Sequence, residues 1–272
     1  MSTATVNGTR IHYDILGEGT PVALSYCLGG NLELWRPQAQ LLAQYYRVIL
    51  WDPRGHGRSA SPDALEDYGI TTSASDLAGL LDHLDIDRAH VGGLSMGGGI
   101  AARFAQMYPQ RALSVCILDS NTAAGLPVPE KTKQIRENTA LLCEAGDMRE
   151  AARYFIANSP PYELFAGNSE DNRKVVEDMV AAADPVGFAN TLRAMSTPAA
   201  PTEELKHILA PTLIVAGDHD PALAAIRLTH EHIAGSVLKI IPGAGHLSNI
   251  DAPDAVLAVL QEFLQQVDTA ST

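Results

Sequence analysis

Residues 90–99 read HVGGLSMGGG, an apolar run that passes into a Gly-x-Ser-x-Gly pattern centred on Ser95. The run predicts a buried strand, and the residues after Ser95 predict a helix. A serine on such a sharp strand-to-helix turn takes a strained backbone conformation that lifts its hydroxyl clear of the sheet. Gly93 and Gly97 have no side chains that could collide at this turn. The pattern therefore predicts an exposed serine nucleophile, and its structural alternative is a serine that only caps the helix.

The predicted nucleophile requires a histidine, because a serine hydroxyl is a poor nucleophile until a base takes its proton. The histidine in turn requires an acid that orients it, and after this kind of turn the acid precedes the histidine along the chain. Among the nine histidines, His246 fits that order, because it lies in a glycine-rich segment directly after the apolar run at residues 237–241. We interpret the other histidines as structural or surface residues, since they precede or adjoin the serine, lack a loop setting or lie among polar residues.

The acid is expected just after the apolar run at residues 212–216, where the sequence Gly-Asp-His-Asp-Pro offers Asp218 and Asp220. Asp220 is favoured because the chain has left the strand by that point, whereas Asp218 is near enough to the strand end to form the turn. Asp119, which ends another apolar run, is the main local rival. In the structural alternative, Asp218 and Asp220 serve only as turn and helix-cap residues.

Acyl transfer also needs two backbone N–H groups that point at the negative charge developing on the carbonyl oxygen. The first comes from the residue after the nucleophile, which is Met96. The second comes from the loop after an early strand, and within the segment SYCLGGN at residues 25–31 we expect it from Leu28.

Strand and helix signals alternate along most of the chain. Asn7-Gly8 between two β-rich runs predicts an N-terminal hairpin. Buried strands are predicted at residues 21–26, 47–51, 90–94, 113–118, 212–216 and 237–241. Amphipathic helices are predicted at residues 33–44, 71–84, 96–108, 222–233 and 253–267. This alternation predicts an α/β protein with a mainly parallel, twisted sheet that carries helices on both faces.

The alternation stops between about residues 126 and 205, where amphipathic segments replace the strand signals, at residues 130–144, 148–158, 173–183 and 185–195. Proline-rich stretches border this region on both sides, so we expect a helical insertion between two strands. The predicted division is a core formed by residues 1–125 and 203–272, with the insertion at residues 126–202. Helices placed there can cover the carboxyl end of the sheet, where open α/β sheets bind their ligands.

Composition and charge exclude several classes of function. The chain of 272 residues has 19 basic and 32 acidic side chains and a net charge of −13, the wrong sign for binding nucleic acid or an anionic membrane. Its first residues lack the apolar segment of a signal peptide, so we expect a cytoplasmic protein. Three widely spaced cysteines are expected as free thiols. Glycine patterns at residues 55–60 and 97–102 lack the context of a dinucleotide site, and no cluster has metal-ligand spacing, so no cofactor or metal is predicted.

Taken together, these motifs resemble the α/β-hydrolase superfamily over residues 6–267. The matching pieces are WDPRGHGRS at residues 51–59, Gly-x-Ser-x-Gly around Ser95, Gly-x-x-Asp ending at Asp220, and Gly245-His246. The resemblance implies that Ser95, Asp220 and His246 are nucleophile, acid and base, and that the insertion is a cap over the substrate pocket. It also implies architectural roles for Asp52, Arg54 and His56.

A narrower resemblance is to the 3-oxoadipate enol-lactonases, carried by residues 24–31 and 93–98. Tyr26 and Cys27 depart from it, because the enol-lactonases have Asn and Ser there and many superfamily members have His and Gly. The resemblance implies a cofactor-free serine hydrolase that cleaves a small carboxylic ester or lactone, such as 3-oxoadipate enol-lactone, through an acyl-enzyme. Such a lactone carries a carboxylate, for which the insertion offers the basic candidates Arg149, Arg153 and Arg193.

Two other classes of function fit the same residues. The first is another reaction of the same triad, either hydrolysis of a carbon–carbon bond or perhydrolysis of an acid. The second is a ligand receptor built on a hydrolase fold, although pure binding does not need an activated nucleophile. The composition also allows a homo-oligomer.

Overall fold

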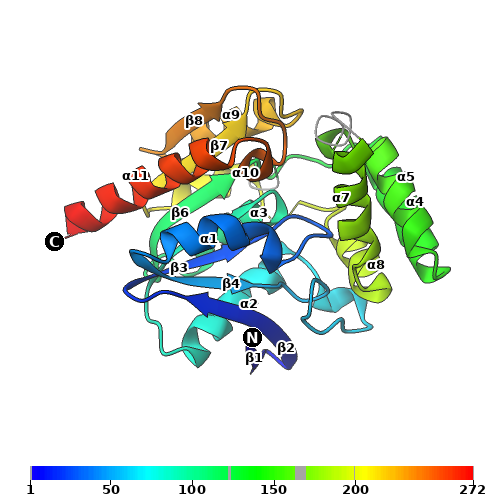
Figure 1. The fold of residues 1–272 in the computed structure, drawn as a ribbon, viewed down its shortest axis with the longest axis horizontal. Coiled ribbons are helices and arrows are strands. Elements are labelled where there is room, and N and C mark those ends of the chain that lie inside the picture. Colours follow the sequence, from blue (N-terminus) through cyan, green and yellow to red (C-terminus); the bar gives the residue numbers. More distant parts are fainter. Residues whose placement is uncertain (1, 122–123, 163–169, 199, 272) are drawn as a thin grey trace.

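An eight-stranded sheet runs through the protein, and the computed structural model describes residues 2–121, 124–162, 170–198 and 200–271 (Figure 1). The strands lie in the order β1-β2-β4-β3-β5-β6-β7-β8. The pairs β1–β2 and β2–β4 are antiparallel, and the other pairs are parallel. Their bounds are β1 Ser2–Val6, β2 Thr9–Leu16, β3 Thr20–Ser25, β4 Tyr46–Trp51, β5 Ala89–Leu94, β6 Ala112–Leu118, β7 Thr212–Gly217 and β8 Val237–Ile241. This arrangement confirms the predicted α/β fold with a mainly parallel sheet.

The predicted strands are present, with ends shifted by no more than one residue. Asn7 and Gly8 take positive φ angles of 47° and 72° in the turn between β1 and β2, as a tight hairpin requires. From β3 to β7 nearly every strand residue is buried, because helices cover both faces of the sheet. The continuous apolar runs that predicted these strands are a consequence of this two-sided cover.

The helices outside the insertion also follow the predicted order. Their bounds are η1 Leu32–Trp35, α1 Arg36–Leu42, η2 Leu65–Asp67, α2 Ile70–His83, α3 Met96–Met107, η5 Thr202–His207, α9 Leu223–His232, α10 Ser248–Asp251 and α11 Pro253–Ser271. The single helix predicted at residues 33–44 is divided into η1 and α1, since Pro37 lacks the N–H of a helical hydrogen bond and belongs in a first turn. No helix within the described residues is both long and apolar enough to cross a membrane.

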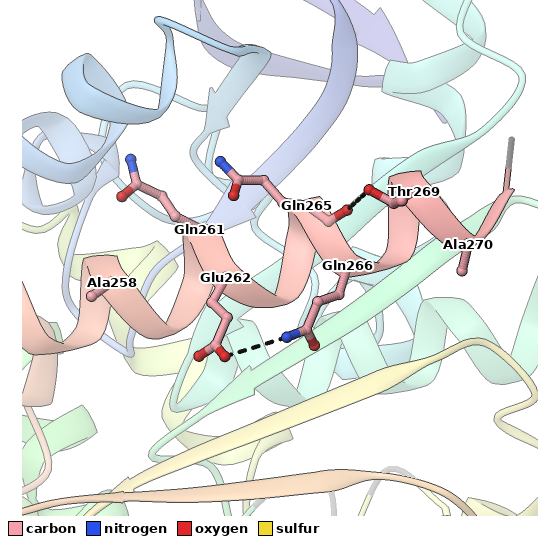
Figure 2. Close-up of a pocket in the computed structure, with 7 residues that line it drawn as sticks. All are labelled: Ala258, Gln261, Glu262, Gln265, Gln266, Thr269 and Ala270. Atoms are coloured by element: carbon pink, nitrogen blue, oxygen red, sulfur yellow. Dashed lines mark hydrogen bonds between the residues drawn. The ribbon is translucent and has the colours of Figure 1, made fainter.

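Helix α11 extends past the sheet, and its carboxyl end projects from the body of the protein (Figure 1). A shallow depression runs along this helix, lined by Ala258, Gln261, Glu262, Gln265, Gln266, Thr269 and Ala270 (Figure 2). The hydrogen bonds drawn there stay within the helix, from Thr269 Oγ1 to Gln265 O at 2.8 Å and from Gln266 Nε2 to Glu262 Oε1 at 3.3 Å. The depression contains none of the residues predicted to carry chemistry.

The insertion between β6 and β7 contains helices and no strand within its described residues, in agreement with the predicted helical segments. It holds α4 Glu130–Glu144, α5 Met148–Asn158, η4 Pro160–Tyr162, α7 Glu170–Ala181 and α8 Pro185–Ala194. Asp147 and Asp184 are the N-cap residues of α5 and α8. The Asp147 carboxylate accepts from Glu150 N at 3.0 Å, and the Asp184 carboxylate accepts from Gly187 N at 2.8 Å. Figure 1 shows these helices grouped together, apart from the helices that flank the sheet.

The loop after β4 ties distant parts of the sheet together through Asp52. The Oδ1 atom of Asp52 accepts from Leu32 N at 2.7 Å, and Oδ2 accepts from Arg58 N at 3.0 Å. The Nδ1 atom of His12 lies 3.0 Å from the same Oδ2. Asp52 and His12 are buried, so these contacts hold the loop after β3 against β2 and β4. The architectural role expected for Asp52 agrees with these contacts.

Arg54 joins the same loop to α2 through a buried ion pair. Its Nε and Nη2 atoms donate to Asp76 Oδ2 at 2.6 Å and to Asp76 Oδ1 at 2.8 Å, and its Nη1 donates to Asp67 O at 2.9 Å. Both side chains are almost completely buried. Removal of the guanidinium therefore leaves a carboxylate buried without its counter-charge.

Arg54→Met should lower the free energy of unfolding by about 3–5 kcal/mol, because a buried ion pair loses one partner. Urea denaturation followed by circular dichroism measures this change. Lys174→Met is the matched control, since the ammonium of Lys174 pairs with Asp178 at 2.8 Å on the exposed surface of α7. The control should leave the free energy of unfolding nearly unchanged, because solvent screens an exposed ion pair. Equal effects of the two substitutions would contradict the role given to Arg54.

Candidate active site

Ser95 occupies the turn between β5 and α3 with φ +56° and ψ −112°, a conformation that residues with a side chain rarely adopt. Its backbone N–H donates to Leu118 O at 2.8 Å, which ties the turn to the end of β6. A Cβ atom at Gly93 would lie 2.6 Å from Ser25 O, and one at Gly97 would lie 2.5 Å from it. Only glycine therefore allows α3 to begin this close to the end of β3.

His246 and Asp220 form a hydrogen-bonded row with Ser95. The Oγ atom of Ser95 is 2.8 Å from Nε2 of His246, and Nδ1 of His246 is 3.0 Å from Oδ2 of Asp220. A carboxylate can only accept, so Nδ1 carries the proton and Nε2 is available to accept one from the serine hydroxyl. The imidazole and the carboxylate are both buried. The structure thus brings together the three side chains whose order along the chain suggested the site.

The charge of Asp220 controls the protonation of His246. Burial by itself lowers the pKa of the imidazole, but the charge and hydrogen bond of Asp220, together with the charge of Asp119, outweigh the cost of burial. The pKa of His246 is therefore raised above its ordinary value of 6.5. An imidazole stabilised in this way can hold a proton while a reaction proceeds.

Two loops at the carboxyl ends of β7 and β8 position the acid and the imidazole. A Cβ atom at Gly217 would lie 2.2 Å from Ala244 O, so glycine lets the loop after β8 pack against the end of β7. The Oδ1 atom of Asp220 accepts from Ala222 N at 2.8 Å, which leaves Oδ2 for the imidazole. Because parallel strands end at the same edge of a sheet, both loops lie beside the turn after β5.

The two rival carboxylates have other partners. Asp218 is exposed and accepts from Gly243 N at 2.8 Å, as expected of a turn residue. Asp119 is buried at the end of β6, where it accepts from Gly217 N and from the amide and hydroxyl of Ser248. Burial raises the pKa of Asp119 to about 7, although the nearby imidazole acts in the opposite direction. None of its described hydrogen bonds reaches the imidazole, so Asp119 braces the loop that carries His246 instead of orienting the ring.

Leu28 and Met96 occupy the positions expected of oxyanion donors. Gly30 N donates to Cys27 O at 3.0 Å, which closes a tight turn around Leu28. Met96 is the first residue of α3, where a backbone N–H has no acceptor inside the helix. Neither amide donates a hydrogen bond to any part of the chain that the structure describes. Within the described residues, neither amide is therefore occupied by a partner in the chain.

Tyr26, which departs from both family patterns, links two of these loops. Its hydroxyl donates to Asn249 Oδ1 at 3.0 Å, and its ring packs edge-on against Trp35. The Nδ2 atom of Asn249 donates to Leu34 O at 3.1 Å. The loop after β3 is thereby fastened to the segment that follows His246. The sequence carries no signal for this contact, because the two partners are 223 positions apart.

This arrangement has relatives among known proteins. Residues 20–253 match the family described as alpha/beta hydrolase fold. The chain belongs to this family. The α/β hydrolase is 33% identical over 273 residues to 3-oxoadipate enol-lactonase 2 of Acinetobacter baylyi, and the match covers 96% of this chain and 97% of that protein.

Solved structures give the same picture of the α/β hydrolase. The enol-lactonase from Burkholderia xenovorans LB400 is 30% identical with a TM-score of 0.83, and the match covers 97% of this chain and 100% of that one. A malate-bound thermophilic esterase from Thermogutta terrifontis is 27% identical with a TM-score of 0.86, covering 98% of each chain. The protein is therefore a hydrolase whose relatives include enol-lactonases and an esterase.

A cavity of about 380 Å³ opens beside Ser95 and His246 in the α/β hydrolase. Its walls include Ile135, Phe155 and Tyr162 from the insertion. This volume suits a small-molecule ligand. Among the described residues, no group of three or more His, Cys, Asp or Glu side chains could hold a metal ion.

The arginine that lines the cavity is not one of the three candidates suggested by the sequence. Arg149, Arg153 and Arg193 do not line the cavity and form ion pairs instead. Arg149 pairs with Asp178, and Arg153 pairs with Glu177. Arg193 pairs with both Glu137 and Glu144. Arg136 on α4 does line the cavity, and it donates through Nη1 to Met195 O at the end of α8. Sequence analysis missed Arg136, because the side of a mostly polar helix that faces the ligand depends on how that helix packs.

Proposed function

We propose that this α/β hydrolase cleaves a carboxylic ester or lactone by transferring the acyl group to Ser95. The observation that carries the proposal is the hydrogen-bonded row from the strained Ser95 turn through His246 to Asp220. A serine that served only as a helix cap would not need a base 2.8 Å from its hydroxyl. The enol-lactonase and esterase relatives support the same class of reaction.

In the proposed reaction, Nε2 of His246 takes the proton of Ser95 Oγ as this oxygen attacks the substrate carbonyl. The N–H groups of Leu28 and Met96 donate to the resulting oxyanion. Asp220 stabilises the imidazolium, which gives its proton to the leaving oxygen as the acyl C–O bond breaks. Water activated by the same imidazole then releases the acid and restores the serine hydroxyl.

The insertion has the position of a cap in this proposal. Residues 126–202 form the cap, and residues 1–125 and 203–272 form the core. The lining of the cavity supports this division, because the core contributes the nucleophile and base while α4, α5 and η4 contribute the facing wall. A wall of this kind shields the site from bulk solvent and selects the substrate.

The substrate in this proposal carries a carboxylate that Arg136 binds. In its described contacts the guanidinium donates through Nη1 alone, and the described lining of the cavity contains no acidic side chain. Burial lowers the pKa of Arg136, yet a guanidinium stays protonated at neutral pH. A substrate carboxylate supplies a counter-charge for this partly buried cation. The 3-oxoadipate enol-lactone named for the relatives meets this description.

Ser95→Ala should lower ester and lactone hydrolysis by a factor of about 10⁶, because the nucleophile is lost. Initial rates with p-nitrophenyl butyrate and 3-oxoadipate enol-lactone measure this effect. A serine-directed phosphonate should label the wild-type protein and leave the variant unlabelled. Ser75→Ala is the control, since the hydroxyl of Ser75 bonds only its own helix and Tyr108 in the described contacts. Near wild-type turnover by the Ser95 variant would reject the mechanism.

Asp220→Asn should lower kcat by about 10⁴-fold, because an amide does not hold the imidazole in the required tautomer. Asp119→Asn should cause a much smaller loss.

The neutral imidazole is the active form, so wild-type kcat/KM should fall on the acid side around a midpoint above 6.5. Loss of the Asp220 charge should move that midpoint to lower pH. Rates from pH 5 to 9 test both points, and a larger loss from the Asp119 variant would reverse the two roles.

Arg136→Met should raise KM for 3-oxoadipate enol-lactone about 10- to 100-fold, since a hydrogen bond to a charged group is worth about 1.5–3 kcal/mol. Hydrolysis of the neutral p-nitrophenyl butyrate should change by less than about twofold, because that ester makes no use of the charge. Arg193→Met is the control, as its guanidinium pairs with Glu137 and Glu144 away from the cavity. Equal losses for the charged and neutral substrates would show that Arg136 only supports the fold.

A further inference from the structure

Tyr162, at the end of η4, is a buried residue of the insertion that contacts two parts of the proposed machinery. Its hydroxyl donates to Leu28 O at 3.1 Å and lies 4.0 Å from Cys27 Sγ. Its ring meets the imidazole of His246 edge-on, with the ring centroids 6.5 Å apart. On its other side the ring packs against Phe155. The carbonyl oxygen is the stronger acceptor, so the single phenolic proton is directed at Leu28.

The peptide groups on both sides of Leu28 are held by hydrogen bonds. The preceding peptide contains Cys27 C=O and Leu28 N–H, which point in opposite directions because the peptide is planar and trans. Gly30 N donates to Cys27 O at 3.0 Å, so the N–H of Leu28 points away from that turn. The following peptide contains Leu28 C=O, and its described hydrogen bond comes from Tyr162. Removal of the Tyr162 phenol oxygen leaves the peptide that follows Leu28 without its described hydrogen bond.

Glycine at position 29 makes this second anchor necessary. Gly29 takes φ +75°, and a glycine moves easily to other backbone conformations. A Cβ atom there would lie 3.1 Å from the ring of Phe188 and 3.3 Å from Val180 Cγ2. Phe188 and Val180 of the insertion therefore lie close to Gly29, but their apolar contacts do not orient a peptide group. The hydrogen bond from the Tyr162 hydroxyl to Leu28 O is directional and does orient it.

We propose that Tyr162 is a positioning residue for the Leu28 amide, so that the insertion sets the geometry of the oxyanion site as well as covering the substrate. This inference rests on the proposed function, in which the Leu28 N–H donates to the oxyanion. The hydroxyl of Tyr162 does not touch the reacting atoms and acts through the loop. Burial raises the pKa of Tyr162 well above its ordinary value, so the phenol remains a neutral donor over the working pH range.

Tyr162→Phe removes this hydroxyl and keeps the ring contacts with His246 and Phe155. We expect kcat for p-nitrophenyl butyrate to fall roughly 10- to 100-fold per active site, less than or similar to the loss of a whole oxyanion donor. The KM should change by less than about twofold, because the ground-state ester makes little use of the oxyanion donors. An alkyl boronic acid, which forms a tetrahedral adduct on the serine, should bind more weakly by about the same factor as kcat falls.

The matched control is Tyr154→Phe. The hydroxyl of Tyr154 accepts from Asn138 Nδ2 at 2.7 Å, within the insertion and away from the loop after β3. This variant loses the same atom and should keep wild-type kcat and boronic acid affinity. Titration of active sites with a serine-directed phosphonate normalises every rate, and thermal unfolding checks that each variant is folded.

The outcomes separate this inference from the proposed function. Unchanged kcat per active site and unchanged boronic acid affinity in Tyr162→Phe would overturn the positioning role while leaving the serine mechanism intact. A rise in KM alone would also overturn it, because the phenol would then be a substrate contact. A loss confined to the fraction of active protein would reduce Tyr162 to a structural residue. Full hydrolysis by Ser95→Ala would instead overturn the proposed function itself.

Discussion

The close approach of α3 to the end of β3 is the constraint on which the site depends. No side chain fits at Gly93 or Gly97, because a Cβ atom at either position would overlap the carbonyl oxygen of Ser25. The strained backbone of Ser95 costs about 1–3 kcal/mol, and the buried packing of β5 and α3 offsets it. With the turn held in this way, the Cβ atom of Ser95 has a fixed place beside the surrounding loops.

Four strand ends meet at this turn, and contacts between their loops make the site rigid. Asp119, directly after β6, accepts from Gly217 N at the end of β7 and from Ser248 N, two residues beyond His246. Tyr26 at the end of β3 reaches Asn249 in the same segment. These contacts hold the Leu28 loop and the His246 imidazole in place, and in the proposed mechanism such preorganisation stabilises the oxyanion. The polar residues behind the site therefore help to set its geometry.

In the proposed mechanism, the insertion contributes to both selectivity and chemistry. Ser95 and His246 of the core line one wall of the cavity, and residues from the helices between β6 and β7 line the other. Arg136 gives that wall a charge, while Tyr162 reaches from it to the loop after β3. In this proposal, substitutions in the wall alter substrate selectivity as long as Tyr162 keeps its hydrogen bond to Leu28 in the loop after β3.

The local sequence was sufficient to predict the strands, the Ser95 turn and the order of acid and base, because apolar periodicity and glycine act over a few neighbouring residues. It could not choose firmly between Asp119 and Asp220, since both follow strands that end at one edge and differ only in where their oxygens point. It also missed Arg136, Tyr162 and Asn249. The direction of each of these side chains is decided by how helices and loops far apart in the chain pack together. Tertiary structure alone sets that packing, because a mostly polar helix can turn about its axis without changing its own pattern of residues.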